Sequence, residues 1–562
     1  MPTAERSFPA LQPLQSAPQP DRAAPCALIC IERGAGLIER ELTYEIPLEW
    51  RGKLSIGQAV SVSLRNGRVL GFVTGFCHEI DFDRSHLKPL GQIFPGPPLF
   101  DDLALKVARW MASYYHCSLA ECLAMFIPAG AAPSLEAKFQ FIAPEPLRAL
   151  RDLGRTPKLF AIANAVYEAK KPLSAREIGK ILGSSAETDQ IRRLCEAKIL
   201  EIAPEANQNG VKAKLLSAVR ITSEGKSLLN GDGWAKLLKS APRQAIALQE
   251  LALRESGWTT VGELSREAGI ETNTLRALEK KGALTWTQIE TLRAPVAAKI
   301  EARTVQLTEE QQAAVKGIET ALELAQIGDA ATILLHGVTA SGKTEVYLAA
   351  IEKCLELGRR ALVLVPEIAL TAQTVEIFQK RFGSRVAILH SALATGERFD
   401  EWRRAAGQIE GASAEIVVGA RSAVFAPCRE VGLIIIDEEH DGSYKQDATP
   451  RYHARDVAAR RAGLEGAVLL LGSATPSSES YLRAVKGEYG HLKMPSRATG
   501  KPLPEVEIID MTSEARGGKL PVLSNRLRDD LCNVVARGEQ VILFLNRRGF
   551  ATYVQCLGCG HV

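Results

Sequence analysis

Residues 331–358 read ATILLHGVTASGKTEVYLAAIEKCLELG, and they carry the strongest fold signal in the chain. An apolar run leads into the pattern GxxxxGKT, and an amphipathic segment follows, with Tyr347 and Ile351 on its inner face. An apolar strand, a glycine-rich loop and a helix in this order are the required setting of a phosphate-binding loop. We therefore predict a nucleotide site in a RecA-like α/β lobe, in which parallel strands alternate with helices.

The residues of this loop have distinct predicted roles. Backbone N–H groups at the start of the helix can surround phosphates, Lys343 can reach the β- and γ-phosphates, and Thr344 can bind Mg²⁺. The predicted ATP-binding residues of the loop are Gly337, Val338, Thr339, Ala340, Ser341, Gly342, Lys343 and Thr344.

A second apolar run, VGLIII, ends at Asp437 and Glu438. The carboxyl ends of parallel strands face the ligand, so we predict that Asp437 binds Mg²⁺ and that Glu438 orients or deprotonates the attacking water. Lys343, Asp437 and Glu438 are the predicted catalytic residues. A solvated turn is the alternative for two adjacent acids, but the apolar run before them favours a strand end. A third run, AVLLLG, ends at the polar turn 473–475.

Length and composition limit the possible functions. A chain of 562 residues is too long for one hydrophobic core, and 46% hydrophobic with 24% charged residues is typical of folded globular domains. A net charge of +4 requires any nucleic-acid surface to be a local patch. Scattered cysteines and apolar runs far shorter than about 18 residues predict a cytoplasmic protein without a membrane span. We interpret the proline-rich residues 1–25 as a flexible leader.

Two segments repeat one pattern: 172–202, PLSAREIGKILGSSAETDQIRRLCEAKILEI, and 258–286, WTTVGELSREAGIETNTLRALEKKGALTW. Each has a helix, a glycine-bearing turn, a capped second helix and a closing apolar strand, which predicts two winged-helix modules. Few basic residues lie on the second helices, so DNA contact and a spacing or protein-binding role remain equal alternatives. The basic candidates are Arg192, Arg193, Arg276, Lys280 and Lys281.

Eight motifs occur in one order: GVTASGKT, PEIALTAQ, LHSALATGER, VVGARSAVFAP, IIIDEEHDGSYKQ, RYHARDVA, LGSATPS and ILFLNRRGF. From about Cys26 to the last residue the chain resembles the PriA (primosomal protein N′) family of superfamily 2 helicases. The resemblance implies an ATP-dependent 3′ to 5′ DNA helicase that recognises stalled or collapsed replication forks and initiates primosome reassembly. It also implies ATP, Mg²⁺ and Zn²⁺ as cofactors. The implied partners are forked and single-stranded DNA, other primosome proteins, the replicative helicase loader and single-strand-binding protein.

The resemblance also assigns roles to residues outside the loop. Gln311 is the expected adenine-side residue. Aromatic faces stack on unpaired bases and cations neutralise phosphates, so an aromatic-rich loop suits single-stranded DNA, with a hydrophobic surface patch as the alternative. The implied DNA contacts are Pro366, Glu367, Gly419, Arg421, Ser422, Tyr444, Lys445, Arg451 and Tyr452. The residues implied to couple ATP state to DNA are His440, Ser473, Ala474 and Thr475.

The predicted domains follow from these motifs and from the periodicity between them. They are a leader (1–25), a β-rich domain like those that bind DNA 3′ ends (26–97), a helical connector (98–135), two winged-helix modules (155–225 and 240–295), the first RecA-like lobe (300–500), and the start of a second lobe with a zinc-binding insertion (501–562). The family has an aromatic and an acidic residue before Tyr44, where this chain has Leu42 and Thr43, which leaves 3′-OH capture open.

The last sixty residues predict an incomplete second lobe, with strands near 506–509 and 541–545 and one helix between them. Cys556 and Cys559, with His561, offer at most three ligands where a structural zinc needs four. We therefore interpret the chain as C-terminally truncated and expect it to bind ATP and DNA but to hydrolyse and unwind little. The alternatives are a nucleotide-binding scaffold for forks and a translocase on double-stranded DNA.

Overall fold

The computed structural model describes residues 24–31, 41–64, 67–94, 96–128, 130–183, 188–207, 213–254, 257–293, 306–409, 411–500, 502, 504–514 and 522–544. The predicted leader up to residue 23, and Cys556 and Cys559, lie outside these ranges. The chain divides into two compact units at about residue 500. Within the described ranges, no helix is long and apolar enough to cross a membrane.

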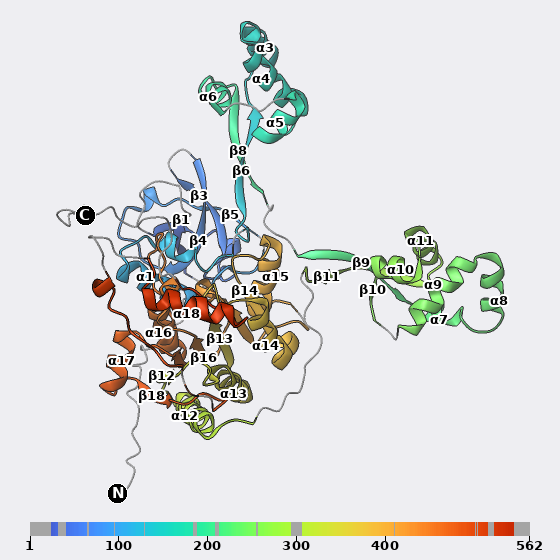
Figure 1. Ribbon diagram of the computed structural model, residues 1–562. Coiled ribbons are helices and arrows are strands. Elements are labelled where there is room, and N and C mark those ends of the chain that lie inside the picture. Colours follow the sequence, from blue (N-terminus) through green and yellow to red (C-terminus); the bar gives the residue numbers. More distant parts are fainter. Residues whose placement is uncertain are drawn as a thin grey trace. The chain divides into compact units, whose positions relative to one another are not determined.

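The central element of the first unit is a seven-stranded sheet in which every described pairing is parallel (Figure 1). Its strands, in the order β14-β15-β13-β16-β17-β12-β18, are β14 (Val386–Leu389), β15 (Ile416–Gly419), β13 (Arg360–Leu364), β16 (Val431–Ile436), β17 (Val468–Ser473), β12 (Thr332–Gly337) and β18 (Gly490–Met494). The helices between them are α12 (Glu309–Gln326), α13 (Lys343–Glu356), α14 (Ala372–Phe382), α15 (Thr395–Ala405), α16 (Ala454–Glu465) and α17 (Ser478–Val485).

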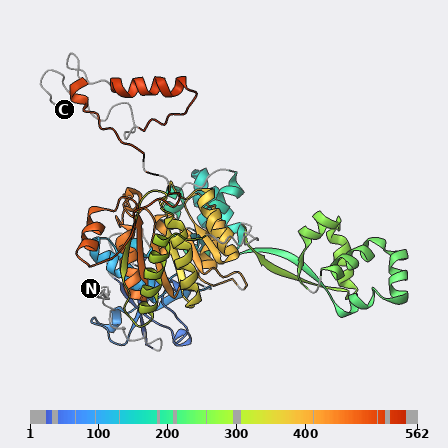
Figure 2. The same cartoon turned by 60° about the horizontal axis from the view of Figure 1, so that its bottom comes forward.

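Successive side chains of the strands point to opposite faces of this sheet, and each face has its own core. On β12, Ile333 and Leu335 pack in one cluster with α12, α13 and α14, whereas Leu334 packs in the other with α16. Figure 2 shows helices flanking the strands. A parallel sheet covered on both faces requires near-continuous apolar strands, which explains why VGLIII and AVLLLG do not alternate. The predicted RecA-like α/β class is confirmed.

An antiparallel sheet of five strands forms the β-rich domain, in the order β2-β1-β4-β3-β5. The strands are β1 (Cys26–Ile31), β2 (Leu42–Glu45), β3 (Ala59–Leu64), β4 (Gly67–Cys77) and β5 (Leu90–Ile93). The helices α1 (Asp102–Tyr114) and α2 (Leu119–Leu123) follow. Buried residues of α1, including Met111, belong to the same core cluster as α16 and β16. The indole of Trp402 on α15 donates to the carbonyl of Phe126, so the segment after α2 also contacts α15.

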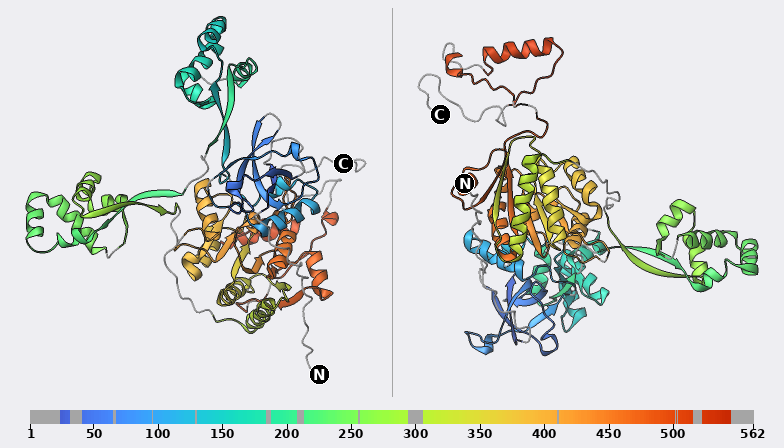
Figure 3. Two further views of the ribbon diagram at one scale, coloured as in Figure 1. Left: turned by 180° about the vertical axis from the view of Figure 1, so that it is seen from behind. Right: turned by 90° about the horizontal axis from the view of Figure 1, so that it is seen from below.

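Two further sheets of three strands carry the repeated pattern (Figures 1 and 3). The first module has β6 (Ser134–Phe141), α3 (Pro146–Asp152), α4 (Pro157–Ala169), β7 (Leu173–Ser174), α5 (Ala175–Leu182), α6 (Thr188–Glu196) and β8 (Leu200–Asn207). The second has β9 (Lys214–Ile221), α7 (Ser223–Ser227), α8 (Gly231–Ser240), α9 (Pro242–Leu253), β10 (Thr259–Thr260), α10 (Val261–Ala268), α11 (Thr272–Lys280) and β11 (Leu284–Thr291).

The two modules share their capping chemistry. Ser174 and Thr260 each begin a helix in a reciprocal capping box, and Gly183 and Gly269 end these helices in the left-handed conformation. Each module also contains a long antiparallel ribbon, β6 with β8 and β9 with β11. The modules therefore begin earlier than the expected 155–225 and 240–295, because the first ribbon strand lies far in sequence from its partner. Residues 214–221, expected in the first module, pair in the second.

The unit after residue 500 differs from its prediction. The predicted helix is present as α18 (Asn525–Ala536), capped by Ser524. The predicted strands near 506–509 and 541–545 are wrong for the described residues, which have no strand there. Ile508 and Ile542 are 93% and 94% exposed. A strand needs a neighbour to pair its N–H and C=O groups, and no strand is described within this unit.

Short 3₁₀ turns complete the described elements. They are η1 (Leu48–Trp50), η2 (Arg84–His86), η3 (Leu153–Arg155), η4 (Gly383–Arg385), η5 (Arg421–Phe425), η6 (Gly442–Tyr444) and η7 (Met511–Glu514). Two of them, η5 and η6, follow the carboxyl ends of β15 and β16 and so lie beside the site described next.

Candidate nucleotide site and adjoining DNA edge

The phosphate-binding loop joins β12, which ends at Gly337, to α13, which begins at Lys343. Gly342 has a φ of +83°, and a Cβ there would lie 2.2 Å from the side-chain nitrogen of Gln311, so this position requires glycine. The Lys343 ammonium donates to the Gly337 carbonyl at 3.1 Å and lies 3.4 Å from Glu438 Oε1. The predicted phosphate ligand therefore already faces the predicted catalytic acid.

The same loop fits a nucleotide in a second respect. The hydroxyl of Ser341 is buried and has no hydrogen-bond partner among the described residues. Gln311 Nε2 donates to the Ser341 carbonyl at 3.0 Å, while its Oε1 accepts from the Thr308 N–H and caps α12. An unpaired buried hydroxyl is costly, and a phosphate oxygen would satisfy it. Gln311, Ser341 and Lys343 thus lie together at the loop, with one polar group left unpaired.

Asp437 stands at the carboxyl end of β16, as predicted, and a residue that we did not predict holds it. The Tyr347 hydroxyl donates to Asp437 Oδ1 at 2.8 Å, and the tyrosine is buried. Burial raises the pKa of Asp437, and the bond from Tyr347 opposes this rise. The sequence pattern places Tyr347 on the inner face of its helix without a partner. Its position four residues after Lys343, on the same helix face, was the available signal.

The predicted coupling residues lie in one group at the ends of β16 and β17. His440 Nδ1 is 2.8 Å from the Ser473 hydroxyl, and His440 Nε2 is 3.4 Å from the Thr475 hydroxyl. The Thr475 N–H donates to the Ser473 hydroxyl at 3.0 Å. Ala474 lies between them in the turn. His440 therefore joins the acidic turn after β16 to the turn after β17.

The predicted DNA contacts after β13 and β15 are partly exposed. Glu367 and Ser422 face solvent, whereas Pro366 and Gly419 are buried. A Cβ at Gly419 would lie 2.2 Å from the Leu389 carbonyl oxygen, so this glycine permits close packing of the backbone. Of these four residues, Pro366 and Gly419 shape the edge, whereas Glu367 and Ser422 offer their side chains to a ligand.

Arg421, the remaining predicted contact on this edge, bonds to the neighbouring loop. Its guanidinium donates to the carbonyls of Ser443 and Lys445 at 3.0 and 2.6 Å. The strand end after β15 is thereby tied to the turn that follows the predicted catalytic acids.

The prediction that Tyr444 and Tyr452 stack on DNA bases is wrong. Tyr444 is 0% exposed and Tyr452 is 2% exposed, so neither ring offers a face to a base. The Tyr444 hydroxyl lies 2.7 Å from the Asp437 carbonyl and 3.1 Å from that of Leu364, and Tyr452 packs edge-to-face on Phe425. Burial in the lobe gives both rings a more favourable free energy than exposure as a stacking surface would. The Tyr444 hydroxyl also finds hydrogen-bond partners there.

The two cations of the same loop differ from its tyrosines. Lys445 and Arg451 are exposed, and the Lys445 ammonium also bonds to the Arg451 carbonyl. The Lys445 ammonium lies 5.4 Å from the centre of the Tyr115 ring, at the end of α1. The loop therefore presents charge, not aromatic faces, to solvent.

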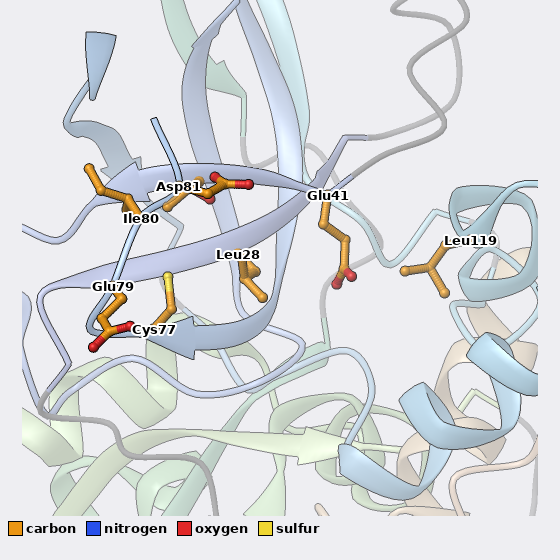
Figure 4. Close-up of a pocket in the computed structure, with 8 residues that line it drawn as sticks. Leu28, Glu41, Cys77, Glu79, Ile80, Asp81 and Leu119 are labelled. Carbon is orange, nitrogen blue, oxygen red and sulfur yellow. The ribbon is translucent and has the colours of Figure 1, made fainter. Parts of the chain in front are cut away.

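The β-rich domain has an open cavity of about 740 Å³ (Figure 4). It lies beside Leu42 and Thr43, the two positions at which this chain differs from the family. Its lining residues are Leu28, Glu41, Thr43, Cys77, Glu79, Ile80, Asp81 and Leu119. Three of them are carboxylates, and Glu41 is paired with Arg109 at 2.8 Å. Carboxylates accept hydrogen bonds from hydroxyl groups and repel phosphates. Tyr44 itself is buried, and its hydroxyl bonds to the Ser63 carbonyl.

Several basic candidates of the winged-helix modules are paired within their own modules. Arg192 lies 2.5 Å from Asp189, and Arg193 lies 3.1 Å from the same carboxylate. In the second module, Arg276 pairs with Glu279 and stacks 3.7 Å from the centre of the Trp286 ring. These pairs are exposed and weak, so they reduce but do not abolish the positive potential of each helix.

No group of three or more histidine, cysteine, aspartate or glutamate side chains that could hold a metal ion occurs in the described part of the chain. The predicted zinc ligands Cys556 and Cys559 lie outside that part. Nine cysteines within it are free thiols.

Comparison with known proteins gives two matching family models. Residues 29–128 match the 3′DNA-binding domain (3′BD) of PriA, and residues 308–483 match the DEAD/DEAH box helicase domain. Among solved structures, the helicase domain of Pyrococcus furiosus Hef is 18% identical, with 34% of this chain and 38% of that chain covered and a TM-score of 0.25.

Curated relatives match over most of the chain. Replication restart protein PriA of Bacillus subtilis is 35% identical over 528 residues, which are 93% of this chain and 62% of that protein. PriA of Synechocystis is 33% identical over 521 residues, or 90% and 59%. The chain thus spans about three fifths of the length of these relatives. These matches confirm the resemblance that the eight motifs predicted.

Proposed function

We propose, from the homology of this chain to replication restart protein PriA, that it is the ATP-binding and DNA-binding part of a 3′ to 5′ DNA helicase that acts at stalled or collapsed replication forks. The observation that carries the proposal is the convergence of Lys343, Asp437 and Glu438 at one edge of a parallel sheet, next to an unpaired buried hydroxyl at Ser341. This combination suits the phosphates of a nucleotide.

Each residue has a role that follows from its chemistry. Lys343 would leave Glu438 for the β- and γ-phosphates, and Glu438 would then be free to accept a proton from the attacking water. Thr344 and Asp437 would hold Mg²⁺, which supplies charge neutralisation when it is bound. Tyr347 keeps Asp437 oriented and favours its ionised form. Gln311 would contact the adenine side.

The DNA side of the proposal rests on the exposed residues of the adjoining edge. Glu367, Ser422, Lys445 and Arg451 face solvent, and the two cations can neutralise phosphates of a single strand. We extend the proposal to forked DNA, other primosome proteins, the replicative helicase loader and single-strand-binding protein as partners, because the relatives are replication restart proteins. Cys556 and Cys559 alone do not complete a zinc site, so no step depends on zinc.

DNA-stimulated phosphate release, measured beside strand displacement on a forked substrate, tests this function. A motor releases phosphate faster when DNA is added and separates the fork in the 3′ to 5′ direction. A scaffold that only holds nucleotide would bind ATP·Mg²⁺ and DNA without such stimulation. Glu438→Gln is the internal control, because it should retain nucleotide and lose turnover. Absence of both nucleotide and DNA binding would contradict the motor and the scaffold alike.

A further inference from the structure

The third residue of the acidic turn, Glu439, has contacts unlike those of the two acids before it. Its carboxylate is buried and lies at the start of α17. Oε1 accepts from the Ser477 N–H at 2.6 Å, and Oε2 accepts from the hydroxyls of Ser477 and Ser480 at 3.1 and 2.9 Å. Arg455 at the start of α16 donates to Oε2 at 2.9 Å. Four donors from two helix starts thus converge on one side chain.

The network is closed, because its donors also bond to one another. Arg455 also donates to the hydroxyls of Ser477 and Ser480, at 2.7 and 3.2 Å. Burial raises the pKa of Glu439, but the Ser477 N–H, Arg455 and Ser480 outweigh it and hold that pKa below its ordinary value. A buried ion pair is often no more stabilising than well-packed apolar residues of similar volume. Stability alone therefore gives little reason for a charged group at this position.

The position of Glu439 gives a better reason. Its backbone N–H donates to the Gly472 carbonyl at 3.0 Å, so main chain and side chain together bind the turn after β16 to both ends of the turn after β17. The residue before it, Glu438, has a φ of +44°, which is a strained conformation for a residue other than glycine. Any rotation of this strained turn must move the carboxylate that holds Ser477.

We propose that Glu439 is a positioning residue that links nucleotide state to DNA affinity, by holding the turn from Ser473 to Ser477 in register with Asp437 and Glu438. The inference rests on the proposed function and adds to it a part that neither hydrolysis nor DNA contact requires. His440 supplies one connection between the two turns, and Glu439 supplies a second, buried one at the far end of the same turn.

The test is the linkage between two binding equilibria. The affinity for a fluorescein-labelled oligo-dT is measured with and without the ATP analogue AMP-PNP and Mg²⁺, and the ratio of the two affinities is the coupling. Couplings of this kind are typically about 5- to 150-fold. Glu439→Gln keeps the volume of the side chain but replaces one accepting oxygen with an NH₂ group. This donor must face either the Ser477 N–H or Arg455, which are donors themselves. We expect the ratio to fall close to one, while each affinity measured alone stays near that of the unmodified chain.

Glu465→Gln is the matched control. Glu465 is also buried, is paired with Arg461 at 2.7 Å and accepts from the Val431 N–H, but it touches neither turn. Glu465→Gln should retain the ratio of the two DNA affinities, although it should lose about as much stability as Glu439→Gln. Ser480→Ala removes one donor and should lower the ratio partly, which keeps the test available if Glu439→Gln does not fold.

An unchanged ratio in Glu439→Gln, or an equal fall in Glu465→Gln, would overturn the inference and leave the proposed function standing. An unmodified chain that binds both ligands without any coupling would overturn it as well. Failure of the unmodified chain to bind AMP-PNP or oligo-dT at all would instead overturn the proposed function.

Discussion

The nucleotide edge and the loop 442–452 follow the same strand, yet their side chains have opposite roles. At the edge, Asp437 and Glu438 stand where the sequence predicted them. In the loop, Tyr444 and Tyr452 are buried although the sequence predicted exposed stacking platforms. The difference teaches that a strand-end motif fixes where polar groups lie, because all parallel strands end at one edge. It does not fix the direction in which a loop aromatic points.

The largest effect that we expect from this comparison is on stability. Tyr444→Ala removes a fully buried ring and should lower the free energy of unfolding by about 3 to 5 kcal/mol, by analogy with other aromatic-to-alanine changes in cores. Urea denaturation followed by circular dichroism measures it. Tyr444→Phe keeps the ring and should lose only about 1 kcal/mol. If the Tyr444→Ala protein were as stable as the unmodified one, burial of the Tyr444 ring in the core would be contradicted.

Lys343→Ala should have the next largest effect, on function instead of stability. The ammonium is the cation nearest to Glu438, and removal of one such group from a transition state lowers turnover by about 10²- to 10³-fold. Fluorescent nucleotide binding and phosphate release measure it. Unchanged binding and turnover would show that the loop does not hold phosphates.

The exposed cations of the loop should affect DNA and little else. The double variant Lys445→Ala, Arg451→Ala should bind single-stranded DNA more weakly, and its dependence on salt should be less steep by about 0.7 in log–log slope for each phosphate that the variant no longer neutralises. Fluorescence anisotropy at several salt concentrations measures this. The matched control is Arg192→Ala in the first winged-helix module, whose cation is already paired with Asp189. Equal slopes in the double variant and the unmodified chain would exclude the loop from the DNA surface.

Tyr347→Phe should have the smallest effect, a change in pH dependence. The pKa of Asp437 is raised by burial and held down in part by the Tyr347 hydroxyl, so loss of that hydroxyl should raise it further. Mg²⁺ needs the carboxylate, which is present above this pKa and is lost as pH falls through it. The acidic limb of Mg²⁺-dependent nucleotide binding should therefore move to higher pH. If the acidic limb of this pH profile stayed in place or moved to lower pH, the role of the Tyr347 hydroxyl in lowering the pKa of Asp437 would be contradicted.

Local sequence patterns predicted some elements and site residues of this structure correctly and missed others. The loop at Gly342 and the strand end at Asp437 depend on residues close in sequence, and the structure has them as expected. The predicted cap on the second helix of the second module is wrong, because Glu271 precedes α11 without a side-chain cap bond, and the caps at Ser174 and Thr260 belong to the helices before the glycine turns. The ribbon of β6 with β8 joins residues about seventy positions apart, from Ser134 to Asn207, so local periodicity placed the module boundary late. The partners of Tyr347 and Glu439 lie on elements distant in sequence, Asp437 after β16 and the starts of α16 and α17, and no local pattern displays such contacts.

The close approach of Gly472 to Tyr347 also limits the order in which this site could change. A Cβ at position 472 would lie 1.7 Å from the Tyr347 hydroxyl oxygen and 2.8 Å from the ring carbon that bears it. Exchange of the tyrosine for phenylalanine would remove the first clash but not the second. An alanine at position 472 could thus be tolerated only after position 347 had given up its six-membered ring, and with it the donor that holds Asp437. The residue at position 347 must therefore change before the glycine at position 472 can be replaced.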